Sequence, residues 1–208
     1  MKTPVRAATA AMAAFALCAC GHSSASDSGT ASTAASASQP STSKDSGAAS
    51  DGMMTLLPTG NLVIQVPGDA ITGTTTTYDD GMQQTYYDSR GSIPLTVAVE
   101  YYAAGAKPAA SILTAEQQAL TAQSIQPKVT PVDVPGGSGA NRLDWQTTAI
   151  PPWLQDRKTS EVPITCAGII VDGPGGDSYG VYVFADPKIP ESQNRMSSVL
   201  ASVAVNAS

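Results

Sequence analysis

Residues 162–185 read VPITCAGIIVDGPGGDSYGVYVFA, and this stretch decides how the rest of the chain is interpreted. Two apolar segments, Val162–Val171 and Ser178–Ala185, flank the connection Asp172-Gly-Pro-Gly-Gly-Asp177. A short connection rich in glycine and proline between two apolar segments is typical of a β-hairpin. The stretch therefore predicts two neighbouring antiparallel strands.

The residues outside this hairpin add further strands and two helices. Leu95–Tyr102 alternates strictly between apolar and other residues, which is the pattern of a strand. Further strands are expected at Asn61–Val66, Met82–Asp88, Lys128–Val134 and Ala140–Ile150, and helices at Ala109–Ser124 and Glu191–Ser202. This order predicts an α+β fold in which a largely antiparallel sheet of about six strands is packed between helices.

The first 19 residues have the features of a secretory signal peptide. Lys2 and Arg6 precede the apolar run Ala7–Leu17, and small Ala19 lies just before Cys20. A transmembrane helix is the alternative, but the run is shorter than the roughly 20 apolar residues that span a bilayer. We therefore expect residues 1–19 to be a signal peptide that is removed.

Residues Leu17-Cys-Ala-Cys-Gly21 resemble the lipobox of bacterial lipoprotein precursors. The resemblance implies cleavage before Cys20, a diacylglycerol on its thiol, and attachment to the outer, extracytoplasmic face of the cell membrane. Cys18 departs from the usual small residue at its position. If Cys18 were the acceptor instead, bulky Leu17 would occupy the cleavage position, so Cys20 is the predicted lipidation site. A diacyl anchor binds durably without help from the protein surface.

A polar segment separates this cysteine from the rest of the chain. Between Gly21 and Gly52 almost every residue is Ser, Ala, Thr, Gly or Asp. Such a composition cannot bury enough apolar surface to offset chain entropy, so a disordered tether is expected. The expected organisation is a signal peptide over residues 1–19, the lipidated cysteine and tether over residues 20–52, and one α+β domain over residues 53–208.

Charge and cysteine content narrow the classes of partner. The formal net charge is −6 and would be about −8 without Lys2 and Arg6, and no basic cluster is present. Nucleic acid is therefore not an expected partner. Only Cys166 would remain as a thiol after processing and lipidation. It lies in an apolar segment, where a buried inert side chain is expected rather than a nucleophile.

The order of the elements resembles the PsbP-like fold and, within it, the LpqN type of actinobacterial lipoprotein. The resemblance is carried by Leu62-Val-Ile-Gln-Val-Pro-Gly68, Gly139-Ala-Asn-Arg-Leu-Asp-Trp145, Cys166-Ala-Gly-Ile-Ile-Val-Asp172 and the closing Met196–Val205 segment. The chain departs from it at Asp69-Ala-Ile71, where a tryptophan is expected, and at the long Pro151–Glu161 loop. The resemblance implies a non-catalytic protein that binds other proteins or small apolar ligands. The family offers no catalytic residues that could be assigned to positions of this chain.

The chain contains few residues of the types that commonly take part in catalysis. The one histidine, His22, falls in the expected tether, which argues against a folded nucleophile–base pair or a histidine metal site, and no cofactor is expected. The carboxylates Asp79, Asp80, Glu100 and Asp144 are the remaining candidates. A pair of carboxylates could serve a hydrolase, but solvated surface charges are the expected role, with Glu100 and Asp144 on the polar sides of their strands.

The two tryptophans lead to different expectations. Trp145 shares a strand face with Leu143 and is expected in the core. Trp153 follows Pro151-Pro152 in a polar connection, where it is either a contact for a protein partner or a lid on the core.

The leading functional hypothesis is a membrane-anchored, non-catalytic module that binds an unknown protein or small apolar ligand through the sheet's concave face or the Trp153 loop. The alternatives are a carboxylate-based cell-wall hydrolase and a structural component of the envelope.

Overall fold

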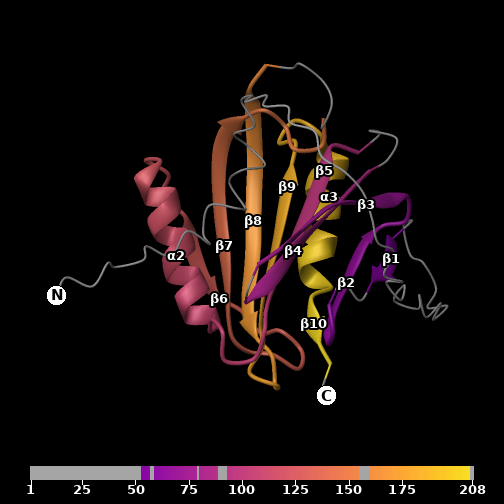
Figure 1. The fold of residues 1–208 in the computed structure, drawn as a ribbon. Coiled ribbons are helices and arrows are strands. Elements are labelled where there is room, and N and C mark those ends of the chain that lie inside the picture. The colour runs from indigo at the N-terminus through magenta and orange to yellow at the C-terminus, as the bar shows by residue number, and fades with distance from the viewer. Residues whose placement is uncertain (1–52, 57–58, 79, 89–92, 155–159, 207–208) are drawn as a thin grey trace, which may run out of the picture.

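A computed structural model describes residues 53–56, 59–78, 80–88, 93–154 and 160–206. The expected signal peptide, Cys20 and the tether lie outside these residues. Within them the chain forms one seven-stranded sheet, one three-stranded sheet and the two helices α2 (Ala109–Ala122) and α3 (Pro190–Ala201) (Figure 1).

The seven-stranded sheet has the order β3-β4-β5-β9-β8-β7-β6, and every neighbouring pair is antiparallel. Its strands are β3 (Ala70–Thr77), β4 (Gly81–Asp88), β5 (Leu95–Tyr102), β6 (Lys128–Pro131), β7 (Ser138–Ala149), β8 (Val162–Asp172) and β9 (Ser178–Ala185). The smaller sheet has the order β1-β2-β10, with strands Met53–Leu56, Leu62–Pro67 and Ala204–Val205.

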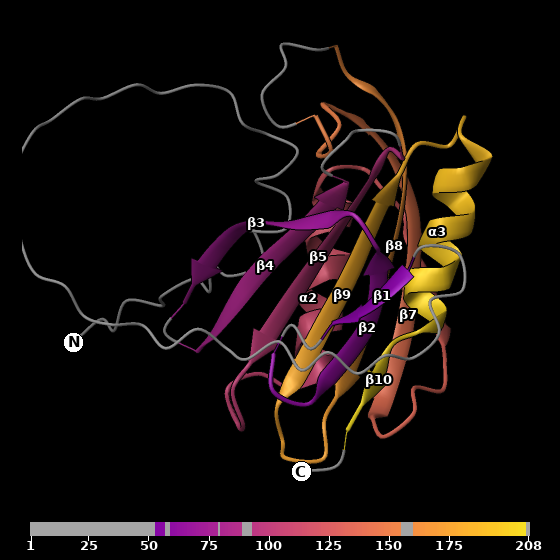
Figure 2. The ribbon, with the colours of Figure 1, turned by 90° about the vertical axis from the view of Figure 1, so that its right-hand side faces the viewer.

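The two faces of the large sheet are covered by different elements. Helix α2 lies on one face, whereas α3 and the three-stranded sheet lie on the other (Figures 1 and 2). Alternate residues of a strand point to opposite faces, so Val181 and Val183 of β9 join the core on the α3 side while Tyr182 and Phe184 join the core on the α2 side. All residues of β9 are buried, as expected for a strand covered on both faces.

The α+β class and the antiparallel sheet are confirmed by this strand pairing. The β8–β9 hairpin forms where residues 162–185 predicted it, and the Gly173 amide donates to the Asp177 carbonyl oxygen across the turn at 2.8 Å. The expected strand count is too low, because β1, β3 and β10 were not predicted. β10 has only two residues and β3 is Thr-rich and largely exposed, so neither carries an apolar pattern.

Two glycines in the hairpin strands make room for a tyrosine ring. A Cβ atom on Gly168 would lie 2.6 Å from Tyr182 Cδ1, and one on Gly180 would lie 2.7 Å from Tyr182 Cε2. These glycines belong to β8 and β9, so the Tyr182 ring lies along the α2 face of both strands. A side chain at either position would displace the ring.

We therefore expect Gly180→Ala to lower the free energy of unfolding by about 1–3 kcal/mol, the usual cost of overpacking a core. Urea unfolding followed by circular dichroism measures the change. In a Tyr182→Leu background the same substitution should cost less, because the ring that it contacts is gone. An equal cost in both backgrounds would show that the ring is not the obstacle.

Candidate functional site: a buried carboxyl pair beneath helix α2

Helix α2 contacts the sheet through a stripe that contains a carboxyl group. Its buried residues include Ile112, Glu116 and Leu120, which follow one another at intervals of four. This spacing places all three on one face of the helix. Glu116 is 3% exposed, so a carboxyl group occupies the middle of an otherwise apolar stripe.

A second carboxyl group lies on the sheet below this stripe. Glu100 belongs to β5 and is 2% exposed. Gln83, its partner in β4, donates a hydrogen bond from Nε2 to Glu100 Oε1 at 3.3 Å. The Tyr102 hydroxyl donates to Glu100 Oε2 at 3.5 Å. Glu100 is therefore held by neighbours on two strands.

The ring that lies over Gly168 and Gly180 belongs to the same cluster. Gly180 is the register partner of Glu100 in β9, and the Tyr182 hydroxyl lies 2.9 Å from the place where a Gly180 Cβ would be. Tyr182 is 1% exposed; burial raises its pKa well above the ordinary value, and Glu100 and Glu116 raise it further. Its hydroxyl interacts with Glu100 but makes no hydrogen bond of standard geometry, so it is a buried polar atom directed at the pair.

Burial controls the protonation of the pair. It raises the pKa of Glu100 to about 7, although Lys107 and the hydroxyls of Tyr102 and Tyr182 favour the charged form. Burial and the Glu100 charge raise the pKa of Glu116 to about 8, against the opposing effect of Lys107. A carboxylate in a nonpolar environment loses the hydration that stabilises it. Both groups therefore retain protons at pH values where an exposed glutamate is ionised.

The positive charge near the pair comes from Lys107, which is only half-buried. Its Nζ lies 4.8 Å from the centroid of the Tyr102 ring, within the range of a cation–π contact. One ammonium group cannot neutralise two buried carboxylates. Among the described residues no group of three or more His, Cys, Asp or Glu side chains is arranged to hold a metal ion.

The N-terminal end of α2 is fixed to the hairpin. The Ala109 amide donates to Asp172 Oδ1 at 2.7 Å, and the Ser178 hydroxyl donates to the same oxygen at 2.7 Å. Asp172 thus supplies the acceptor that Pro108, at the N-cap position, cannot offer. At the other end the chain leaves the helix through Ser124, whose φ of 64° is left-handed.

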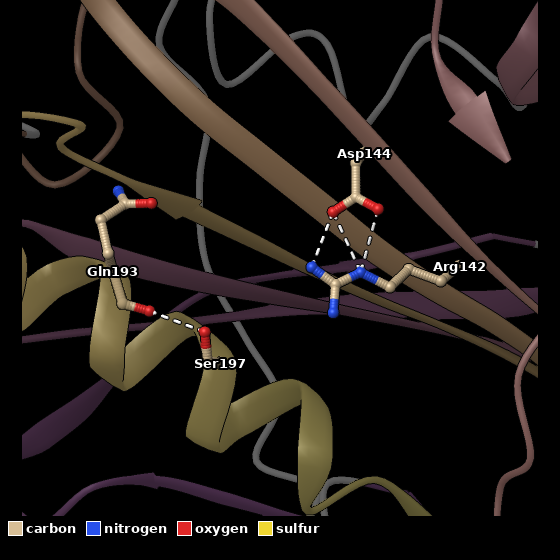
Figure 3. A network of polar contacts seen from close by, with 4 residues as sticks. All are labelled: Arg142, Asp144, Gln193 and Ser197. Atoms are coloured by element: carbon tan, nitrogen blue, oxygen red, sulfur yellow. Dashed lines mark hydrogen bonds and ion pairs between the residues drawn. The ribbon is translucent and has the colours of Figure 1, made fainter. Parts of the chain in front are cut away.

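The candidate carboxylates Glu100 and Asp144 do not converge in the structure. Asp144 lies on β7 on the side of the sheet toward α3, where Arg142 binds it with two nitrogens at 2.7–3.0 Å (Figure 3). Glu100 lies on the α2 side, so the two are on opposite faces. Asp80 is half-buried, and Asp79 lies outside the described residues.

The expectation that Glu100 is a solvated surface charge is wrong. The polar side of β5 faces the core that β5 shares with α2, so that Thr96, Ala98 and Glu100 are buried as well as the apolar side. Glu116 lies inside the helix expected over Ala109–Ser124 and was not predicted as a candidate. The spacing between Ile112, Glu116 and Leu120 is the signal that could have identified it.

Both tryptophans and the Cys166 thiol lie in the apolar core on the α2 side. Trp145 is buried as expected and contacts Phe184 edge-to-face at 6.3 Å between ring centroids. Cys166 is buried in the same cluster. Trp153 is 9% exposed and packs there too, in a position that covers the core; contact with a partner stays a prediction.

Comparisons with known proteins give structural similarity only. No family model and no curated protein sequence matches the chain. The solution structure of cyanobacterial PsbP (CyanoP) from Synechocystis sp. PCC 6803 aligns with a TM-score of 0.49 and 9% identity, over 77% of this chain and 96% of that one. A crystal structure from Bacteroides thetaiotaomicron aligns with a TM-score of 0.40 and 9% identity, over 70% of this chain and 45% of that one.

The first of these is a PsbP protein, from the family whose fold the sequence resembles. At these values neither likeness assigns a family or an activity to this chain. In the part of the chain that the structure describes, no helix has the length and apolar character needed to cross a bilayer.

The carboxyl pair predicts a pH dependence of stability. An ordinary glutamate ionises near pH 4.5, whereas Glu100 and Glu116 do so near about 7 and about 8 in the folded protein. Between these values the folded state binds more protons than the unfolded state, so the free energy of unfolding should fall as pH rises from about 5 to about 8. Urea unfolding at several pH values measures this slope.

The matched variants are Glu116→Gln and Glu191→Gln. In Glu116→Gln the free energy of unfolding should fall less steeply as pH rises, because a neutral amide replaces the group that ionises. Glu191 is exposed on α3 and binds Arg195, so Glu191→Gln should leave the slope unchanged. A wild-type stability that is constant or rises across this range would contradict the prediction.

Proposed function

We propose that the protein is a lipid-anchored, extracytoplasmic binding module whose partner is another protein. The observation that carries the proposal is the lipobox-like Leu17–Gly21 segment, followed by a polar tether and then by a folded domain whose first described strand begins at Met53. A lipid on Cys20 would hold that domain at the outer face of the cell membrane. Partner binding is then left to the domain.

The packing of the domain favours a protein partner over a small apolar ligand. Side chains fill the cores on both sides of the central strands, so the concave face suggested by the sequence is not free over β8 and β9. A surface depression is lined by Pro67, Gly68, Asp69, Ile93 and Arg195 and is open to solvent. This open form differs from the concave sites that bury most of the surface of a small ligand.

Strand β3 is the surface best suited to a protein segment. It is the end strand of the seven-stranded sheet (Figure 2), and most of its residues are exposed. Thr72 and Thr74–Thr77 form an uncharged, β-branched run without proline. The opposite end strand, β6, has four residues, begins with Lys128 and ends with Pro131, features that protect an edge from pairing. An extended segment of a partner could add to β3 as a further strand.

The anchor is tested by Cys20→Ala. We expect this variant to leave the membrane fraction or to accumulate as the unprocessed precursor, because the thiol that accepts the lipid is missing. Cys166→Ala should remain membrane-bound, since that thiol is buried in the domain. Fractionation and intact mass measure both. A processed Cys20→Ala protein that stays on the membrane would defeat the anchoring proposal.

The edge strand is tested by matched cross-linking. A photoreactive residue at Thr76 on β3 should give a discrete adduct with a protein in intact cells, and the same residue at exposed Thr130 on β6 should give none. Adding Thr74→Lys should remove the adduct, because a lysine on an edge strand opposes further pairing. Equal adducts at both edges would contradict a β3 site.

A further inference from the structure

We propose that Glu100 and Glu116 form a proton-operated latch, which holds helix α2 on the sheet while the pair retains protons and loosens the helix when both carboxylates are ionised. The inference concerns a conformational device in the domain. It does not depend on the proposed anchor or on the β3 edge.

The first step of the argument is the place of the pair in the contact. Glu116 lies between Ile112 and Leu120 on the helix face that meets the sheet, and Glu100 lies on β5 with β4 and β9 on either side. Leucine at position 116 would continue the apolar stripe. A carboxyl group in its place contributes favourably only while it is neutral or paired.

The second step is the set of groups that face the pair. Gln83 from β4, Tyr102 from β5 and Tyr182 from β9 are neutral, and Lys107 from the β5–α2 connection is the one positive charge acting on both acids in the described part of the chain. Tyr78 and half-buried Asp80, at the β3–β4 connection, interact electrostatically with Tyr102 and so lie at the margin of the cluster. Two ionised carboxylates therefore leave one negative charge without a counter-charge.

The third step is how water could reach that charge. Glu100 is fixed by strand pairing on both sides, and the Tyr182 ring fills the space beside it over Gly180. The other acid, Glu116, is carried by α2, which packs against β7, β8 and β9. Movement of α2 is thus the change that hydrates both carboxylates with the least disruption of the sheet.

The fourth step is which end of the helix moves. Asp172 holds the N-terminal end through the Ala109 amide, and it also accepts from Ser178. The C-terminal end has no comparable side-chain cap among the described residues and leaves through left-handed Ser124. We therefore expect the helix to pivot about its Asp172 contact and to lift at its C-terminal half.

The direction of the response follows from the sign of the linkage. With burial raising both pKa values, the closed form retains protons that the open form releases, so opening is favoured as pH rises from about 5 to about 8. Above that range both forms are ionised and the opening equilibrium levels off. Acid closes the latch and neutral or mildly alkaline conditions loosen it.

Hydrogen exchange of the full-length chain in detergent tests the latch. After correction for the intrinsic exchange rate, the protection factors of α2 amides should fall by about tenfold per pH unit for each proton released between pH 5 and pH 8. Amides of β8 should stay better protected than those of α2 at every pH, because local opening of α2 leaves the strand pairs intact and global unfolding costs more. Equal protection of α2 and β8 at every pH would mean that α2 opens only when the whole domain unfolds, and the latch would be rejected.

Three glutamate-to-glutamine variants complete this test. Glu116→Gln and Glu100→Gln should each weaken the pH dependence of α2 protection, and both are expected to fold because each removes a buried ionisable group. Glu191→Gln, on the exposed side of α3, should behave as the wild type. A full pH dependence in both Glu116→Gln and Glu100→Gln would overturn the proposal.

Tryptophan fluorescence provides an independent readout. The chain has two tryptophans, Trp145 and Trp153, and both lie in the apolar cluster that α2 helps to cover. Acrylamide should quench the wild-type protein more strongly at pH 8 than at pH 5, and the difference should shrink in Glu116→Gln. Quenching that is independent of pH in the wild type would count against movement of α2.

Discussion

The structure depends on the burial of both faces of its central strands. β8 and β9 form the hairpin around which the sheet is assembled, and apolar side chains leave them on both sides. A sheet buried on both faces needs two covering layers. The chain supplies α2 for one face and, for the other, α3 together with the three-stranded sheet (Figure 1). How each layer covers its face of the sheet determines which side chains are buried there.

The two layers differ in chemistry. On the α3 side, Met196, Val199 and Leu200 of the helix pack with Leu62, Ile64 and Val66 of β2. The remaining buried residue of this helix, Ser192, is polar but does not ionise. On the α2 side, the stripe is interrupted by Glu116, which faces buried Glu100 and the Tyr182 hydroxyl. A buried polar cluster of this kind is a poor source of stability unless all its members are paired. It makes the docking of α2, and not of α3, sensitive to protonation.

The sequence allowed the fold class to be predicted but not the site. The Asp172–Asp177 turn and the alternation in Leu95–Tyr102 are local signals, and local signals locate strands well. They do not say which face of a strand will be covered by a distant helix. Glu100 was therefore expected in solvent, as was Asp144, although their strands direct the two side chains to opposite faces of the sheet. β3 was missed because a threonine-rich edge strand lacks an apolar side on which a pattern could be seen.

The position of the acids explains why the cluster is compatible with a stable fold. Glu100 accepts hydrogen bonds from Gln83 of β4 and from Tyr102 of its own strand, so its carboxyl group keeps polar partners although it is buried. Glu116 is carried by a helix, which can move as a unit because its backbone hydrogen bonds are internal. One acid is therefore fixed and the other movable. Ionisation then acts mainly on the contact between helix and sheet, and the strand pairing that holds the rest of the domain together is spared.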